Sequence, residues 1–416
     1  METQSTSTQA QTAPNYTVPF AIVACLFGIF GFLTSLNNQL VGKLKETFAL
    51  GYGPAMLATA AWFLAYLVFS VPSGKLIEKV GYKKTMVISL FIMVAGALAF
   101  VPAANRVSFR LTLGAIFLLA TGVCALQTSA NPYAAILGPE SSAALRVNLA
   151  QAFNSGASAL APVVATTFIL TNTSRLGTVT EQAHMLITPY IVIALALLLL
   201  GFAVMGLHLP TVNLTRDFRP SDANALSQRS IWSHPHVVLG MIGIFFYVGL
   251  EISLAAIGVR FAQEQGISSL KIAGFLVTAY YLLIMIGRFI GSALMTKIKP
   301  EKLLVGLGIF GILLMVAGMS ISGASAVGCL VLCGLANSIM YPTIFALGIA
   351  ELGPLTSKGS GVITIGNVGG AVIPPLFGLM ADHMGIQHAF LLMILCYVFV
   401  AYYGLWGYKP ERNIAA

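Results

Sequence analysis

The stretch GKLIEKVGYKK, residues 74–84, joins two long apolar runs and decides the fold of this chain. Gly74 has no side chain, so it lets two helices approach each other closely. Glu78 can pair with a cation or with a helix terminus, while Lys83 and Lys84 anchor a short loop in the cytosol beside a membrane. A generic basic loop explains the lysines but not the spacing of the glycine and the glutamate. For these four residues we predict a gating role, that is, control of a conformational change.

Apolar runs of helical length recur along the whole chain. Of its 416 residues, 57% are hydrophobic and 8% are charged, and the mean hydropathy is +0.88. A bilayer core about 30 Å thick requires about 20 apolar residues per helix. The sequence predicts an all-α integral membrane protein, embedded in a lipid bilayer, with twelve transmembrane helices over residues 18–41, 53–74, 84–104, 110–138, 143–171, 186–209, 236–260, 271–295, 302–322, 325–350, 358–381 and 386–408.

The distribution of basic residues predicts the orientation of these helices. With the N-terminus placed in the cytoplasm, fifteen lysines and arginines fall on the cytoplasmic side and seven on the opposite side. Cytoplasmic loops carry such an excess, so we expect both termini to be cytoplasmic. The net charge of +9 then reflects topology and not nucleic-acid binding. Residues 1–17 are polar and are expected to form a disordered cytoplasmic tail with no cleavable signal peptide, and residues 409–416 a cytoplasmic C-terminal tail.

The chain repeats itself at an offset of 213 residues. NSGASALAP at 154–162 corresponds to NVGGAVIPP at 367–375, and GKLIEKVG at 74–81 corresponds to GRFIGSAL at 287–294. The polar segment 211–235 separates the two copies and is predicted to be a cytoplasmic linker between six-helix bundles at 18–210 and 236–408. Two pseudo-symmetric bundles are typical of secondary transporters, which bind substrate near the bilayer midplane between them. Arg288, at the edge of the repeated loop, is a further gating candidate.

Amide side chains gather around the junction of the fourth and fifth predicted helices. In ANPYAAILGPESSAALRVNLAQAFNSG, residues 130–156, Glu140 and Arg146 lie at the cytoplasmic boundary and are predicted to take part in gating. Deeper in the membrane, amides cannot face lipid without a large cost, so they meet one another or line an aqueous cavity. For Asn131 and Asn154 both interpretations remain open, because amides also hold helices together. For Gln127 and Gln151 the length of the side chain favours the cavity.

These same residues resemble a known family, and GKLIEKVGYKK at 74–84 resembles the Gly-x-x-x-acid-basic-x-Gly-x-basic-basic pattern of the superfamily that contains it. LQTSANPYAAILGPESS (126–142) with RVNLAQAFNSG (146–156), FYVGLEIS (246–253), ELGPLTSKGSG (351–361) and GNVGGAVIPPLFG (366–378) resemble the fucose permease and glucose/galactose transporter branch of the major facilitator superfamily. The resemblance covers all twelve predicted helices. It implies the major facilitator fold, cation-coupled import of a neutral hexose by alternating access, a multi-pass place in the bacterial inner membrane, a monomer, and no cofactor. Amides and aromatic rings suit a sugar, whose hydroxyls both donate and accept hydrogen bonds.

The sequence departs from the fucose permease pattern at two positions. Asn38 stands where the resemblance implies an aspartate, and Gln127 stands where it implies a glutamate; neither can be protonated. Their carbonyl oxygens remain ligands for a hard cation. Glu251 is an acid deep inside a predicted helix, a place where ionisable residues are functional by default. We predict ion coupling through Glu251, Asn38 and Gln127 and favour Na⁺ over H⁺, although protonation of Glu251 keeps the proton alternative open.

Further substrate contacts are predicted on helices that border the cavity in this family: Asn37, Asn38, Tyr247, Tyr280, Asn337 and Asn367. The sequence contains no nucleotide-binding loop, catalytic triad or zinc spacing, so we expect no enzyme activity and no metal other than Na⁺. Proton-driven efflux of a lipophilic drug remains an alternative, although an amide-rich cavity fits it poorly. A non-transporting nutrient sensor is a second alternative, although sensors carry longer cytoplasmic extensions.

Overall fold

A computed structural model describes residues 17–48, 52–164, 178–184, 187–207, 209–210, 230–267 and 269–410. Only the backbone is described for residues 37–47, 52–56, 162–164, 179, 182–183, 270–271 and 273–274. The predicted N-terminal tail, linker and C-terminal tail therefore lie almost entirely outside the described residues, and their boundaries stay predictions.

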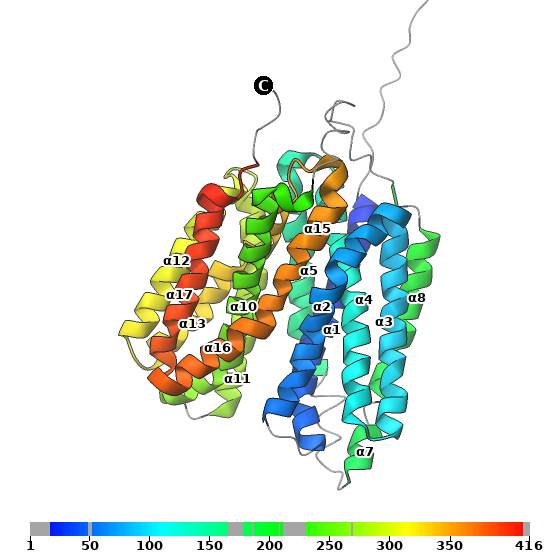
Figure 1. Cartoon of the computed structure of the whole chain (residues 1–416). Coiled ribbons are helices and arrows are strands. Elements are labelled where there is room, and N and C mark those ends of the chain that lie inside the picture. The colour runs from blue at the N-terminus through cyan, green and yellow to red at the C-terminus, as the bar shows by residue number, and fades with distance from the viewer. Residues whose placement is uncertain are drawn as a thin grey trace, which may run out of the picture.

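Helices make up two groups that stand side by side (Figure 1). The first group contains α1 (Thr17–Thr47), α2 (Tyr52–Val80), α3 (Tyr82–Asn105), α4 (Phe109–Ile136), η1 (Glu140–Ser142), α5 (Ala143–Val164), α7 (Val179–His184) and α8 (Ile187–Gly206). The second group contains η3 (Ile231–Ser233), α10 (Pro235–Glu264), α11 (Leu270–Leu294), α12 (Pro300–Ser320), α13 (Ala324–Asn337), α14 (Met340–Gly348), η4 (Gly353–Leu355), α15 (Thr356–Ile365), η5 (Gly366–Val368), α16 (Gly369–Met384), α17 (Ile386–Tyr402) and η6 (Tyr403–Gly407).

The helices agree with twelve membrane crossings. Ten stretches of the described residues are long and apolar enough to cross a membrane. One of them, Leu57–Asn105, covers two helices, α2 and α3. The chain turns between them at Gly81, whose φ of 82° glycine adopts without strain. The 22-residue helix α5 carries the amide-rich stretch and is not one of the ten. Separating α2 from α3 and adding α5 gives the predicted twelve.

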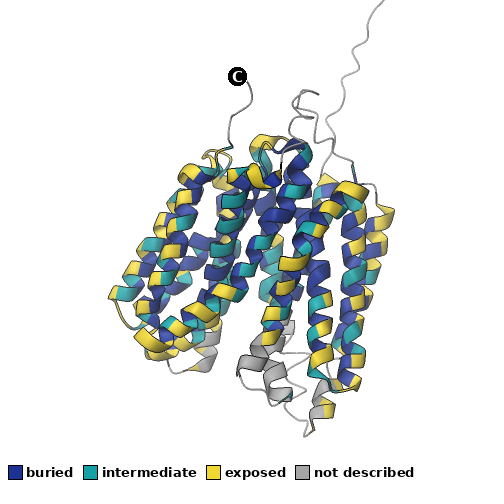
Figure 2. Cartoon of the chain, in the orientation of Figure 1, coloured by how far each residue is buried: buried dark blue, intermediate teal, exposed yellow. Residues whose placement is uncertain are grey.

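Apolar side chains cover the outside of both groups. Figure 2 shows exposed residues along the outer faces of the helices and buried residues where helices meet. Leu199, Phe275 and Leu313, for example, are each more than 60% exposed. Exposed apolar side chains over so large an area are unfavourable in water. The outer faces are thus suited to lipid, so the polar residues on the inner faces carry the chemistry.

Two helices from different groups touch through their glycines. A Cβ atom added to Gly74 on α2 would lie 2.7 Å from the backbone oxygen of Ser357, and one added to Gly361 on α15 would lie 2.8 Å from that of Ser70. Real Cβ atoms do not approach this closely, so α2 and α15 pack backbone against backbone only because both positions lack side chains. The close helix approach expected at Gly74 is therefore present, and it joins the two groups.

Candidate substrate cavity between the two helix groups

The two groups are joined by polar contacts at the end where α2 stops and α15 begins. Lys358 Nζ lies 3.3 Å from Glu78 Oε1, and the backbone N–H of Glu351 donates to Glu140 Oε1 at 3.2 Å. Each contact pairs a residue of the first group with one of the second. We call this end, with Gly74, Glu78, Glu140 and their partners, the closed end. Gly74, Glu78 and Glu140 were predicted to gate, and all three sit at a contact that must break if the groups part here.

Three other gating candidates, Lys83, Lys84 and Arg146, lie on the first group near this end. Lys83 Nζ donates to the backbone oxygen of Met205 at 2.8 Å, and Lys84 is exposed. Arg146 Nε donates to the backbone oxygen of Ala134 at 3.1 Å, near the C-terminus of α4. A cation there satisfies carbonyls that have no helical partner and favours the negative end of the helix dipole. Lys83 and Arg146 thus bind carbonyl groups of the first group near the closed end.

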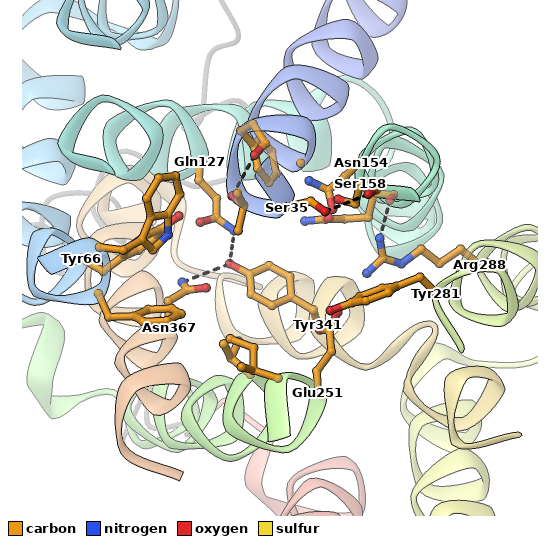
Figure 3. A pocket seen from close by; sticks show the side chains of 18 residues that line it. Ser35, Tyr66, Gln127, Asn154, Ser158, Glu251, Tyr281, Arg288, Tyr341 and Asn367 are labelled. Carbon is orange, nitrogen blue, oxygen red and sulfur yellow. Dashed lines mark hydrogen bonds between the residues drawn. The ribbon is translucent and has the colours of Figure 1, made fainter. Parts of the chain in front are cut away.

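Deeper between the groups lies a cavity whose lining comes from both (Figure 3). It offers about 130 Å³ of space, roughly ten times what one buried water needs, so it can hold a small polar molecule. The lining residues are Phe30, Gly31, Thr34, Ser35, Trp62, Phe63, Tyr66, Gln127, Gln151, Asn154, Ser158, Val248, Glu251, Ile252, Tyr281, Arg288, Tyr341 and Asn367. The first group supplies mostly amides, hydroxyls and aromatic rings, and the second supplies both charges.

The cavity contains part of the set of residues predicted from sequence. Gln127, Gln151, Asn154, Glu251 and Asn367 line it. Asn131, Tyr247, Tyr280 and Asn337 are not among its lining residues, although each is buried beside it in the helix packing. The side chains of Asn37 and Asn38 lie outside the described residues, so the predictions for them stay as made.

Tyr341 on α14 links the amides of the two groups. Gln127 Nε2 donates to the Tyr341 hydroxyl at 2.9 Å, and Asn367 Nδ2 lies 3.5 Å from the same hydroxyl while donating to the backbone of Thr364 at 2.8 Å. The Gln127 Oε1 atom is buried and has no hydrogen-bond partner among the described residues. A buried acceptor without a partner costs free energy, so this oxygen is available to a ligand that brings a donor.

The amides of α4 and α5 both hold helices together and line the cavity, the two interpretations that the sequence left open. Asn154 lines the cavity, yet its Nδ2 also donates to the backbone oxygen of Phe27 at 3.2 Å and so joins α5 to α1. Gln151 Nε2 reaches Asn131 Oδ1 at 3.4 Å, a long and weak contact that leaves the Gln151 amide free for other partners. Asn131 is fully buried and connects α4 with α5. Packing and lining are thus combined in one cluster.

A hydrogen-bonded network behind Glu251 holds the second group together. Asn337 Nδ2 donates to the Tyr280 hydroxyl at 2.7 Å, and the Tyr397 hydroxyl donates to Asn337 Oδ1 at 2.8 Å. The Tyr280 hydroxyl in turn lies 3.4 Å from the backbone oxygen of Glu251. This network ties α10, α11, α13 and α17 into one unit. Tyr280 and Asn337 therefore support the wall that carries the acid.

Arg288 lies elsewhere than its expected place at the edge of a loop. It is 3% exposed and lines the cavity, because α11 continues to Leu294, roughly 9 Å beyond it at about 1.5 Å per residue. Its Nε donates to the backbone oxygen of Ser338 at 3.0 Å, and its Nη1 donates to the Gln151 backbone oxygen and to Ser155 Oγ on α5. A buried guanidinium thus connects the two groups at the floor of the cavity.

The sequence predicted no site role for Trp62, Tyr66 and Tyr341, which form much of the wall. Trp62 and Tyr66 lie one helical turn apart on α2, and Tyr341 faces them from α14. The spacing of four residues places Trp62 and Tyr66 on one face of α2. Because α2 is apolar on most sides, the sequence does not tell whether that face lines a cavity or packs against another helix. The pairing of α2 with α14 across the cavity is known only from the tertiary structure.

Comparison with known proteins places the chain in a family. Residues 20–367 match the family described as the Major Facilitator Superfamily. The chain belongs to this superfamily. It is 39% identical over 407 residues to the glucose/galactose transporter of Brucella abortus, covering 97% of each chain, and 31% identical to the L-fucose-proton symporter of Escherichia coli, covering 96% of this chain and 95% of that one.

Solved structures of the superfamily support the same assignment. A crystal structure of FucP, the fucose:proton symporter of Escherichia coli, in the outward conformation matches with a TM-score of 0.82 and 30% identity, covering 94% of this chain and 99% of that chain. The predicted twelve-helix major facilitator fold and the resemblance to the fucose and glucose/galactose branch are thereby confirmed. The chain is a multi-pass membrane transporter and not an enzyme, in agreement with its relatives in the superfamily.

Proposed function

We propose that this protein imports a neutral hexose by cation-coupled symport, with glucose and galactose as the first candidates. The observation that carries the proposal is the composition of the cavity between the two helix groups. Gln127, Gln151, Asn154 and Asn367 present amides to one enclosed space, with the aromatic side chains of α2 beside them. Sugar hydroxyls need donors and acceptors together, and sugar C–H faces pack on aromatic rings. The names of the relatives, glucose/galactose transporter and L-fucose-proton symporter, agree with this substrate class.

The arrangement of contacts supports alternating access, in which the cavity faces each side of the membrane in turn. The two groups meet through Gly74, the Glu78–Lys358 ion pair and the Glu140–Glu351 hydrogen bond at the closed end. We assign the closed end to the cytoplasm because its loop carries basic residues. The structure would then represent the state that faces outward. Import would require these contacts to break while others form at the opposite end. Both termini cytoplasmic, the bacterial inner membrane and a monomer complete the proposal.

Glu251 is proposed as the residue that couples sugar movement to a cation. It lines the cavity from the middle of α10, and it is the carboxylate among the lining residues. Na⁺ remains the first candidate ion, because Gln127 offers an amide oxygen without a partner and Asn38 stands in for the acid that the fucose permease pattern implies. A proton carried by Glu251 is the second candidate, and the L-fucose-proton symporters among the relatives favour testing it in parallel. Efflux of a lipophilic drug gains no support from an amide-lined space.

Transport by purified protein in proteoliposomes tests the proposal. We expect counterflow of radiolabelled glucose or galactose. A Na⁺ gradient and a pH gradient are then imposed separately, and accumulation is expected with only the gradient of the coupling ion. Insensitivity to replacing Na⁺ with choline, together with loss of uptake on adding a protonophore, would exclude Na⁺ as the driving ion. If no monosaccharide undergoes counterflow in protein that is folded and correctly inserted, the substrate class is wrong.

A further inference from the structure

The two charged side chains of the cavity wall face each other without forming an ion pair. Glu251 and Arg288 both line the cavity and interact electrostatically, and Tyr247, one turn before Glu251 on α10, interacts with both. Figure 3 shows Arg288 reaching from α11 into the cavity with its hydrogen bond going to α5. The other titratable groups that interact with Glu251 are the phenols of Tyr280 and Tyr281 on α11 and of Tyr341 on α14. Arg288 is thus the cation of this set.

Arg288 uses its charge to join the two helix groups. Its Nη1 donates to the backbone oxygen of Gln151 and to Ser155 Oγ, both on α5 of the first group; we call these two hydrogen bonds the Arg288 bridge. Asn148 on the same helix face donates back to the Arg288 backbone oxygen at 2.8 Å and to Ser292 Oγ at 2.9 Å. The contact is buried, with Arg288 3% and Ser155 4% exposed. Hydrogen bonds from a charged donor at a site of low dielectric are stronger than neutral ones.

An ionised Glu251 competes with α5 for the same guanidinium. When the carboxylate carries its charge, attraction across the cavity draws Arg288 away from the neutral oxygens of α5. When a proton or Na⁺ neutralises the carboxylate, that competition ends and the bridge is the better partner. The balance therefore depends on whether the coupling cation is bound.

We propose that Arg288 is the residue through which cation binding at Glu251 controls closure between the two helix groups. The inference rests on the proposed function and adds to it a reason for tight coupling. A cation bound without sugar strengthens the bridge and keeps the closed end shut, so the cation does not leak through. Sugar bound to the Gln151 side chain disturbs α5 at the residue whose carbonyl accepts from Arg288, and so releases the bridge. The empty carrier, with Glu251 ionised, is also free to return.

Flux measurements test this order of events. Glu251→Gln mimics permanent neutralisation, so sugar exchange should continue while net downhill efflux, which requires return of the empty carrier, should fall about tenfold relative to exchange, as the strength of one charge-assisted hydrogen bond implies. Adding Arg288→Gln to Glu251→Gln removes the bridge and should restore the ratio of net efflux to exchange. A double variant that keeps the low ratio of the single variant would overturn the proposal.

A labelling experiment tests the bridge without any sugar. Ser357 is 5% exposed at the closed end, so Ser357→Cys, in protein whose five native cysteines have been replaced, reports opening there through its alkylation rate. Arg288→Gln should raise that rate about tenfold. Arg260→Gln is the matched control, because Arg260 is exposed and pairs with Glu264 and Asp382 inside the second group. With Arg288 intact, the coupling cation, added as acid or as Na⁺, should lower the rate, and Glu251→Gln should abolish this response.

The outcomes separate the inference from the proposed function. Equal alkylation rates in Arg288→Gln, Arg260→Gln and the parent protein would overturn the bridge, whatever sugar is carried. Faster alkylation of Arg288→Gln together with no exchange of glucose or galactose would support the bridge and contradict the substrate. If Arg288→Gln does not fold, Ser155→Ala removes one acceptor while keeping the buried charge, and it should raise the alkylation rate in the same direction; an unchanged rate there would count against the bridge.

Discussion

Removal of the Gln151 amide should weaken sugar binding more than any loss of packing would explain. The side chain is 3% exposed and lines the cavity, and within the described part of the chain its one hydrogen bond is the 3.4 Å contact with Asn131. Because the protein satisfies this amide poorly, we expect a sugar hydroxyl to be its main partner. In Gln151→Ala that hydroxyl stays buried without a partner, which costs about 1–3 kcal/mol. The corresponding increase in Kd is about 5-fold to 150-fold.

The assay is equilibrium binding of radiolabelled galactose and glucose to purified protein. The Arg288 bridge should persist in Gln151→Ala because it uses the backbone oxygen of residue 151 and not its side chain. Gln387→Ala is a matched control: the Gln387 amide donates to the backbone oxygens of Gly318 and Ile321, at 2.9 and 2.8 Å, away from the cavity. It should leave Kd unchanged even if it lowers the melting temperature. An unchanged Kd in folded Gln151→Ala would refute the cavity interpretation and leave this amide with a packing role only.

Three further predictions concern the closed end and the coupling residue. Glu78→Gln removes a partly exposed ion pair with Lys358, an interaction worth about 0–1 kcal/mol. The state in which the closed end is shut loses this stabilisation, so return to that state, and with it sugar exchange, should slow by a few-fold at unchanged Kd. A variant with the two charges swapped should recover, and a large loss of affinity would contradict the gating role. Gly74→Ala places a Cβ 2.7 Å from the Ser357 backbone oxygen and should push α2 and α15 apart. The cysteine of Ser357→Cys should then be alkylated faster, and an unaltered alkylation rate would show that the two helices accommodate the methyl group without opening the closed end. Glu251→Gln should abolish concentrative uptake while retaining exchange; accumulation against a gradient in this variant would remove Glu251 from the coupling mechanism.

The fold follows almost entirely from local features of the sequence. Membrane helices must satisfy their backbone hydrogen bonds internally, so apolar runs of sufficient length are enough to locate them. The repeat at an offset of 213 residues then pairs the helices into two bundles. The apolar runs predict one continuous helix for each crossing. The structure instead divides the tenth crossing into α13 and α14 and the eleventh crossing into α15, η5 and α16. These interruptions are decided by packing against neighbouring helices, which no single run of residues records.

The sequence by itself determined which residues are chemically expensive inside a membrane, because a buried amide or acid must have a partner whatever the fold. It selected Gln127, Gln151 and Glu251 on that ground, and all three line the cavity. Only the tertiary structure determined which residues are the hydrogen-bond partners of such buried polar side chains. Asn337 bonds to two tyrosines inside the second group, and Arg288 reaches across from α11 to α5. These contacts join residues more than fifty positions apart. They depend on how the helices pack against one another, and helices that are apolar on every side do not encode that choice in their periodicity.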